Sequence, residues 1–156
     1  MTFRKIKSWN IPAMIKVSDI LYKCGKNMAE KFDLHHWDNS RFKTWKIVRS
    51  CAKKNDVYLA YNDKNTPVAT FQTCKREERF FFEKFATLPE FSGSGIGTLC
   101  INEIERLGKT ESCKEVICEV YDKSAHAVSF YDRRGFTPYE TVRYGEYNVI
   151  MLKKEI

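Results

Sequence analysis

The sequence lacks several features that would define other classes of protein. It has no run approaching the roughly 20 apolar residues that a membrane-spanning helix needs. Its six cysteines form no C-x-x-C pair, and its three histidines do not flank them at the spacing of a zinc site. It also has no internal repeat and no low-complexity linker. The sequence therefore predicts neither a membrane protein nor a metal site.

The composition is that of a folded domain. Hydrophobic residues make up 43% of the chain and aromatic residues 14%, which is typical of a globular protein rather than a disordered one. One domain over residues 1–156 is the simplest interpretation of this length. The cysteines fall in apolar patterns, and the first residues contain no apolar signal core. We therefore expect buried thiols in a reducing compartment, the cytoplasm.

Positive charge gathers in the first third of the chain. The net charge is +7, and residues 1–56 hold 13 Lys and Arg against 5 Asp and Glu, whereas residues 57–156 hold 14 against 15. Solvated helix faces commonly explain such an excess. Alternatively, this third forms one wall of a site that attracts an anion, such as an acidic substrate, a cofactor phosphate or nucleic acid.

Apolar periodicity predicts the order of the elements. Steps of three and four residues indicate a helix that begins at Asn10-Ile11-Pro12 and a second helix over about 40–53. Later stretches alternate between strand and helix patterns, and a glycine at 108 is expected to end the helix before it. The predicted strands are 3–6, 57–61, 68–73, 79–88, 115–121, 139–143 and 147–153, and the later helices are 95–107 and 124–134. The order β-α-α-β-β-β-α-β-α-β-β predicts a mixed α/β sheet.

A glycine-rich turn is the most informative local feature. Residues 92–98 read Ser-Gly-Ser-Gly-Ile-Gly-Thr and connect a predicted strand to a predicted helix. Such a turn places several backbone N–H groups around one point, beside the positive end of the helix dipole. That arrangement suits a phosphate or pyrophosphate, but a glycine-rich connection without a ligand explains the motif equally well on its own. It is not a P-loop, because no Gly-Lys-Ser/Thr follows.

Three stretches in this order resemble one known family. Residues 85–91 read Phe-Ala-Thr-Leu-Pro-Glu-Phe, residues 92–97 form the glycine turn, and residues 124–136 read Ser-Ala-His-Ala-Val-Ser-Phe-Tyr-Asp-Arg-Arg-Gly-Phe. Together they resemble the GNAT superfamily of acyl-CoA N-acyltransferases. The resemblance implies a mostly antiparallel sheet flanked by helices. It also implies acetyl-CoA as co-substrate and no metal.

The resemblance also implies a set of cofactor-binding residues. The glycine turn would hold the pyrophosphate of coenzyme A, and the strand before it would bind the pantetheine arm and polarise the thioester carbonyl. Ser124 would cap its helix in place of the usual Asn. The implied residues are Phe85, Ala86, Thr87, Ser92, Gly93, Ser94, Gly95, Ile96, Gly97, Thr98, Ser124 and Tyr131.

Two serines depart from the family pattern. Ser92 stands where Arg or Gln is usual, and Ser94 where Lys or Arg is common. A hydrogen bond from a cation to phosphate contributes about 1.5–3 kcal/mol, so the loss weakens this site. We expect both serine hydroxyls to donate instead, with Lys123, Arg133 or Arg134 as sources of the missing charge.

Two residues are implied as catalytic. Tyr131 matches the family tyrosine that protonates the departing thiolate, although a packing role on the sheet is the alternative. Glu83 would deprotonate the amine, and its phenylalanine neighbours would raise its pKa by desolvation. The alternative for Glu83 is an ion pair with Lys84 or Arg79. Glu119 is the reserve base, and Tyr121 is expected to line the acceptor site.

The sequence thus predicts an N-acetyltransferase in which a primary amine attacks acetyl-CoA directly in a ternary complex. The acceptor would be a small-molecule or peptide amine, and the basic first third favours an anionic group on it. Dimers are common in similar proteins, so both a monomer and a homodimer are compatible with the sequence. One alternative is a domain of this fold that binds acyl-CoA without catalysis. A less favoured alternative is a basic nucleic-acid-binding protein, since the charge is scattered.

Overall fold

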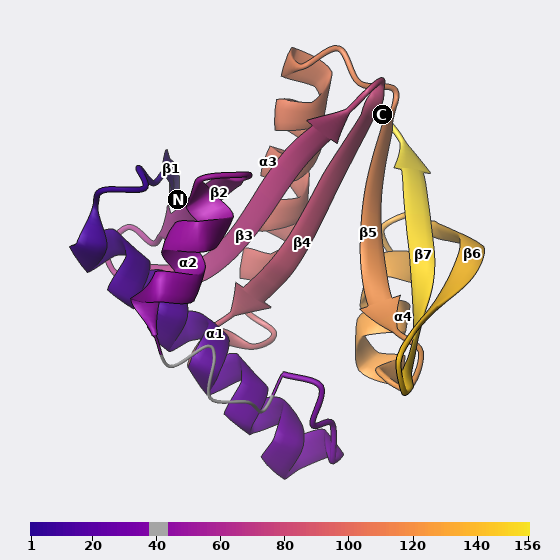
Figure 1. Cartoon of the computed structure of the whole chain (residues 1–156), viewed down its shortest axis with the longest axis horizontal. Coiled ribbons are helices and arrows are strands. Elements are labelled where there is room, and N and C mark those ends of the chain that lie inside the picture. The colour runs from indigo at the N-terminus through magenta and orange to yellow at the C-terminus, as the bar shows by residue number, and fades with distance from the viewer. Residues whose placement is uncertain (38–43) are drawn as a thin grey trace. The chain divides into compact units, whose positions relative to one another are not determined.

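The computed structural model describes residues 1–37 and 44–156 (Figure 1). Its elements follow the predicted order, with one added short 3-10 helix, η2 (Pro89–Phe91). The helices are α1 (Ile11–Phe32), α2 (Trp45–Ala52), α3 (Ile96–Thr110) and α4 (Ala125–Asp132). The strands are β1 (Thr2–Lys5), β2 (Asp56–Tyr61), β3 (Pro67–Arg76), β4 (Arg79–Thr87), β5 (Glu115–Tyr121), β6 (Thr137–Tyr144) and β7 (Tyr147–Glu155).

The strands form a seven-stranded sheet in the order β1-β2-β3-β4-β5-β7-β6. β4 and β5 pair in parallel, whereas the pairs β1–β2, β2–β3, β5–β7 and β6–β7 are antiparallel. The parallel pair is connected through α3, since parallel neighbours need a crossover. The predicted mixed, mostly antiparallel sheet flanked by helices is therefore confirmed.

The chain divides into two compact units. The first comprises Met1–Cys74 with Lys84–Glu103, and the second comprises Lys75–Glu83 with Ile104–Ile156. In the first unit the apolar stripe of α1 packs in the core, as its three- and four-residue spacing predicts. The core members with under 5% exposure are Met14, Val17, Ile20, Leu21, Val48, Val57 and Leu59.

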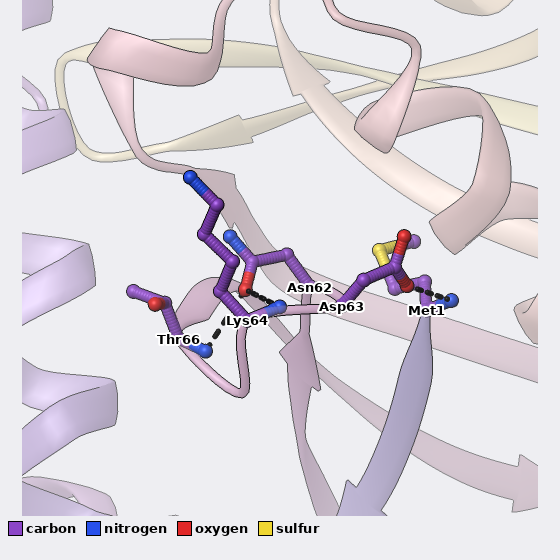
Figure 2. Close-up of polar contacts among 5 residues, drawn as sticks. All are labelled: Met1, Asn62, Asp63, Lys64 and Thr66. Atoms are coloured by element: carbon purple, nitrogen blue, oxygen red, sulfur yellow. Dashed lines mark hydrogen bonds and ion pairs between the residues drawn. The ribbon is translucent and has the colours of Figure 1, made fainter.

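The ends of α1 and the turn after β2 follow their local chemistry. Asn10 caps α1, with its side-chain oxygen accepting from Ala13 N at 3.1 Å. In the turn between β2 and β3, Figure 2 shows the Asn62 Oδ1 accepting from the backbone N–H groups of Lys64 and Thr66 at 3.1 and 2.9 Å. Asn, Asp and Pro in residues 62–67 are typical turn residues, which accounts for this connection. The amino group of Met1 pairs with Asp63 of the same turn at 3.2 Å.

In the second unit, β5 presents two different faces. Val116, Cys118 and Val120 are buried, whereas Glu119 between them is exposed. Ile117, on the same face as Glu119, is also buried, so one face of β5 is buried along its length and the other only in part. Figure 1 shows β5, β7 and β6 side by side at the orange and yellow end of the chain.

The boundaries of three predicted helices differ from the structure. The helix predicted over 124–134 ends at Asp132 as α4. α2 begins at Trp45, with Thr44 as its cap, and the predicted start at residue 40 lies outside the described residues. The helix predicted to end near Gly108 continues to Thr110, so that boundary was wrong. A Cβ on Gly108 would lie 2.7 Å from Ile156 Cδ1 and 3.3 Å from Phe80 Cβ. Close packing, and not helix termination, therefore accounts for this glycine.

Within the described part of the chain, no helix is both long and apolar enough to cross a membrane. Over the same residues, no group of three or more His, Cys, Asp and Glu side chains is arranged to hold a metal ion.

Candidate functional site

The glycine turn adopts a backbone that only glycine takes easily. Gly93 and Gly95 have φ values of +76° and +84°. A Cβ at either position would meet no atom within 4 Å, so the need for glycine is conformational and not steric. Residues 92–95 are exposed, which leaves their backbone open to solvent.

The turn leads directly into the first turn of α3. Leu99 N donates to Gly95 O at 3.1 Å, so Leu99 carries the first N–H that bonds within the helix. The N–H groups of Ile96 and Gly97 precede it and have no intrahelical acceptor, as at every helix N-terminus. Because they follow two positive-φ residues, they extend the row of backbone donors of a phosphate-binding turn.

The Ser94 side chain has a partner within the turn. The Ser94 Oγ donates to Phe91 O at 2.5 Å, and Ser94 N also donates to Phe91 O at 3.2 Å. The hydroxyl of Ser94 therefore stabilises the turn, and its contact with a phosphate stays a prediction. Ser92 is exposed, and its N–H donates to Pro89 O at 3.0 Å.

The strand before the turn is irregular where the pantetheine arm is expected. Lys84 has φ +48° in the middle of β4, a left-handed conformation that interrupts a regular strand. The ladder between β4 and β5 covers three residue pairs, the last being Phe81 with Ile117. Beyond Lys84, Phe85 and Thr87 are half-buried and Ala86 is buried.

Cys24, which the sequence predicts as a core residue of α1, contacts this strand. Cys24 Sγ donates to Thr87 O at 2.9 Å. Desolvation raises the pKa of the Cys24 thiol to about 12, so it stays a hydrogen-bond donor at neutral pH. Sequence reasoning missed this contact because Cys24 fits the apolar stripe of α1, and only the close approach of α1 to the end of β4 reveals it.

Tyr131 lies in an aromatic cluster of the second unit. Its ring centroid is 5.5 Å from that of Phe136 and 5.9 Å from that of Phe82, and its side chain is buried. Burial raises its pKa well above the ordinary value of 10.0, and the neighbouring Cys118 adds to the shift. The phenol is thus protonated at any physiological pH. Both packing and proton donation are compatible with this position.

Glu83 and Tyr131 are associated with opposite faces of the sheet. Phe82 packs against Tyr131, and side chains alternate along a strand, so its neighbour Glu83 belongs to the other face. Glu83 is half-buried. Arg79, one predicted alternative partner of Glu83, pairs instead with Glu115 at 3.3 Å. The role of Glu83 as a base stays a prediction.

The reserve base and its neighbour lie on β5. Glu119 is exposed, and its Oε1 accepts from the Tyr144 hydroxyl at 3.3 Å. Tyr121 is half-buried and makes an edge contact with Tyr147, with ring centroids 5.4 Å apart.

Ser124 occupies the predicted cap position of α4 but does not cap with its side chain. Its backbone oxygen accepts from Ala127 N and Val128 N at 2.9 and 3.0 Å, and within this helix its side chain makes no capping hydrogen bond. Its φ and ψ of −84° and 66° are not the extended values usual for a capping serine. Ser124 is thus the N-cap residue of α4, as predicted, but it caps through its backbone and lacks the expected side-chain hydrogen bond. The residue is buried.

Two of the cations proposed to replace the missing charge lie just after α4 and bond to residues in its last turn. Arg134 donates to Phe130 O at 2.7 Å, and its guanidinium lies 3.6 Å from the centroid of the Phe130 ring. Arg133 donates to Ser129 Oγ at 2.5 Å. Lys123 is exposed. Residues 85–87 and 92–98 belong to the first unit, and Glu83, Ser124 and Tyr131 to the second, so each unit carries its own part of the predicted site.

Comparison with known proteins identifies the family and the fold. The sequence model of the acetyltransferase (GNAT) family matches residues 17–136, which span parts of both units. No curated protein sequence matches the chain significantly. Among solved structures, the PaiA N-acetyltransferase of Thermoplasma acidophilum in complex with coenzyme A has a TM-score of 0.80 at 14% identity, covering 100% of both chains.

Two further structures show the same fold. The ribosomal-protein-S18-alanine N-acetyltransferase of Escherichia coli has a TM-score of 0.70 at 14% identity, covering 99% of this chain and 93% of its own. A GNAT family acetyltransferase of Elizabethkingia anophelis with acetyl-CoA bound has a TM-score of 0.70 at 14% identity, covering 99% and 97%. The chain belongs to the GNAT family of acetyltransferases.

Proposed function

We propose that this protein transfers an acetyl group from acetyl-CoA to a primary amine on a small molecule or peptide, by direct attack in a ternary complex. The observation that carries the proposal is the turn in which Gly93 and Gly95 hold positive φ immediately before α3. It supports pyrophosphate binding by backbone donors alone, without the cations that Ser92 and Ser94 replace. The relatives with coenzyme A or acetyl-CoA bound support the choice of co-substrate.

In the proposed reaction, the amine nitrogen attacks the thioester carbonyl carbon and the carbon–sulfur bond breaks. Glu83 accepts the proton that the amine loses, and Tyr131 donates its phenolic proton to the departing sulfur. The backbone of residues 85–87 stabilises the developing oxyanion. Glu83 and Tyr131 are associated with opposite faces of the sheet, which suits a base on the acceptor side and an acid on the thiol side.

Other parts of the proposal rest on composition and on the thiols. All six cysteines are free, which supports a reducing compartment such as the cytoplasm. An anionic group on the acceptor would match the basic first third of the chain. No feature of the described residues selects between a monomer and a homodimer.

A second candidate function is acyl-CoA binding without turnover. The Ser94 hydroxyl is bonded within the turn, so it does not replace the charge of the usual Lys or Arg. Acetyl-CoA binding with no release of coenzyme A across an amine panel, and with affinity unchanged by Glu83→Gln, would favour this candidate over catalysis.

Thermal unfolding with acetyl-CoA, using ATP as an anion control, tests the proposed cofactor. Ligand at a hundredfold excess over its dissociation constant stabilises a protein by about 2.7 kcal/mol, or roughly 5–10 °C for a domain of this size. We expect this shift with acetyl-CoA and not with ATP. No shift at millimolar acetyl-CoA would contradict both the catalytic and the binding proposals.

A pair of glycine variants tests whether the turn is the binding element. Gly93→Ala and Gly145→Ala each place a Cβ at a positive φ, +76° and +59°, with no atom within 4 Å. Each should therefore cost about 1 kcal/mol of stability for conformational reasons alone. Only Gly93→Ala should reduce the acetyl-CoA shift, because Gly145 lies in the turn between β6 and β7. An equal reduction in both variants would contradict the assignment of the glycine turn as the element that binds acetyl-CoA.

A further inference from the structure

The end of β4 is held against α1 within the first unit. Ala86 and Leu88 are buried and belong to the same core cluster as Val17 and Leu21 of α1. Side chains alternate along a strand, so Thr87 between them belongs to the other face, and it is half-buried. These apolar contacts fix which face of the strand meets α1, whereas the backbone groups need hydrogen-bond partners of their own.

The peptide bond between Thr87 and Leu88 has one hydrogen-bonding group on each side. Leu88 N donates to Val68 O of β3 at 2.9 Å. A planar trans peptide directs its C=O opposite to its N–H, so Thr87 O points away from β3. The donor to this oxygen comes from a helix, because Cys24 Sγ of α1 donates to Thr87 O at 2.9 Å. Cys24 and Val68 therefore hold this peptide from both sides.

The Cys24 thiol is suited to be a permanent donor. Desolvation raises its pKa to about 12, so the thiol keeps its proton throughout the physiological range. A carbonyl oxygen has two lone pairs, and the thiol takes one of them. The second lone pair of Thr87 O can accept an N–H from a ligand. The bond to Cys24 thus orients this carbonyl without excluding a ligand from it.

A charge interaction joins α1 to η2 beside this bond. Lys23 of α1 pairs with Asp19 at 2.8 Å. Asp19 raises the pKa of Lys23 most, and Glu90 of η2 raises it further. Lys23 and Glu90 are exposed, so solvent and salt weaken their attraction. The hydrogen bond from the half-buried Cys24 is therefore the stronger of the two links.

The end of β4 depends on such links because its own backbone is irregular on both sides. Lys84 has φ +48° within β4, and η2 begins at Pro89. Residues 85–87 are therefore a short extended stretch between a left-handed residue and a 3-10 helix. Regular strand geometry is interrupted before and after them, so contacts with β3 and α1 determine their position.

We propose that Cys24 is a positioning residue for the end of β4. Its thiol fixes Thr87 O, and with it the backbone of residues 85–87, in the arrangement that binds acetyl-CoA. This inference rests on the proposed function, in which residues 85–87 hold the cofactor. Cys24 acts through Thr87 and takes no part in making or breaking bonds.

Removal of the thiol should lower the affinity for acetyl-CoA without slowing the saturated enzyme. In the free protein, residues 85–87 would occupy other arrangements part of the time, and the apparent affinity falls with the fraction that stays competent. Bound acetyl-CoA restores the productive arrangement, so the rate at saturation stays the same. One net hydrogen bond corresponds to about a fivefold change in this equilibrium.

Steady-state kinetics and calorimetric titration with acetyl-CoA test this effect. In Cys24→Ala we expect the KM and the dissociation constant for acetyl-CoA to rise about fivefold, with kcat unchanged. Cys51→Ala is the matched control and should change neither, because Cys51 is also half-buried and packs against the same core. Cys24→Ser should recover most of the affinity, since its hydroxyl can donate to Thr87 O.

Amide hydrogen exchange of the free protein tests the link without any ligand. The N–H of Leu88 shares its peptide with Thr87 O, so it reports on the opening of this peptide from β3. We expect this amide to exchange about fivefold faster in Cys24→Ala than in the wild type. The Leu99 amide of α3 should exchange at the same rate in both proteins.

The outcomes separate this inference from the proposed function. Equal Leu88 exchange in Cys24→Ala and the wild type would overturn the inference, and so would a serine variant that binds acetyl-CoA no better than the alanine variant. Tighter acetyl-CoA binding in Cys24→Ala would also overturn it, by showing that the thiol competes with the ligand. Faster Leu88 exchange in Cys24→Ala, in a protein that does not bind acetyl-CoA, would refute only the proposed function.

Discussion

At the scale of single residues, Tyr131 shows how burial suits a side chain to donate a proton. An acid that protonates a thiolate must hold its proton until the carbon–sulfur bond breaks. The aromatic cluster of Phe82 and Phe136 raises the pKa of Tyr131 well above 10.0, so the phenol is protonated throughout the range in which an enzyme works. The packing role and the catalytic role are therefore not exclusive, because the packing produces the protonation state.

Tyr131→Phe should separate these two roles. The variant keeps the ring and its packing, so we expect an unchanged melting temperature and unchanged acetyl-CoA binding. Loss of the phenolic proton should lower kcat by about a hundredfold, the lower end of the range for general acids. The wild type should show no loss of rate from Tyr131 ionisation below pH 10, since its pKa is raised. Equal kcat in the variant and the wild type would leave Tyr131 a packing residue.

Two serine side chains and one cysteine make hydrogen bonds that differ from those expected of their positions, for one physical cause. The Ser94 hydroxyl and the Ser124 side chain were assigned from their positions in a motif, but hydrogen bonding is decided by backbone geometry. The Ser94 hydroxyl donates to Phe91 O, three residues earlier. This hydrogen bond depends on the backbone of η2, which ends at Phe91. Cys24 was missed because its partner, Thr87 O, is 63 residues away in the chain.

At the scale of elements, glycine marks two different requirements that look alike in sequence. Gly93 and Gly95 have positive φ and empty space around them, so their conformation could be predicted from a glycine-rich connection. Gly108 lies within α3, where its lack of a side chain lets Phe80 and Ile156 approach. A pattern at the end of an apolar stripe cannot distinguish a terminating glycine from a packing one, because the packing partner is remote in sequence.

Gly108→Ala should therefore destabilise the protein, although alanine is the better helix former. The added Cβ would lie 2.7 Å from Ile156 Cδ1 and 3.3 Å from Phe80 Cβ, which forces the neighbours to shift. We expect a loss of about 1–3 kcal/mol in urea unfolding. Ile156 is at the chain end, so the double variant Gly108→Ala with Ile156→Ala should recover part of the loss. A stability gain in Gly108→Ala would mean that helix propensity outweighs the contact.

At the scale of the whole molecule, the order of all strands and helices was predictable because most of them are strongly periodic. β5 agrees with its prediction at both ends, since a run of apolar residues broken only by Glu119 lies between the polar residues Lys114 and Asp122. The irregular strand β4 was predicted only as a strand. The positive φ of Lys84 has no local signal, because lysine does not favour that conformation and the surrounding structure must impose it.

Buried thiols distributed over the molecule predict how its stability depends on pH. Desolvation raises the pKa of Cys24 and of Cys100 from 9.0 to about 12 in the folded state, and raises that of Cys118 further. A raised folded pKa means that the unfolded state releases the proton first as pH rises. The stability is thus fully present below pH 9 and declines above it until the folded thiols ionise.

Urea unfolding at pH 7, 9 and 10 measures this decline. Each such thiol should remove about 1.4 kcal/mol of stability at pH 10, because the unfolded state ionises there and the folded state does not. Cys100→Ala is the informative variant, since it leaves a cavity that lowers stability at every pH but removes one titrating group. Its stability should therefore fall less steeply between pH 9 and 10 than that of the wild type. Parallel profiles would show that the Cys100 thiol ionises equally in both states, and hence that it is not desolvated in the folded protein.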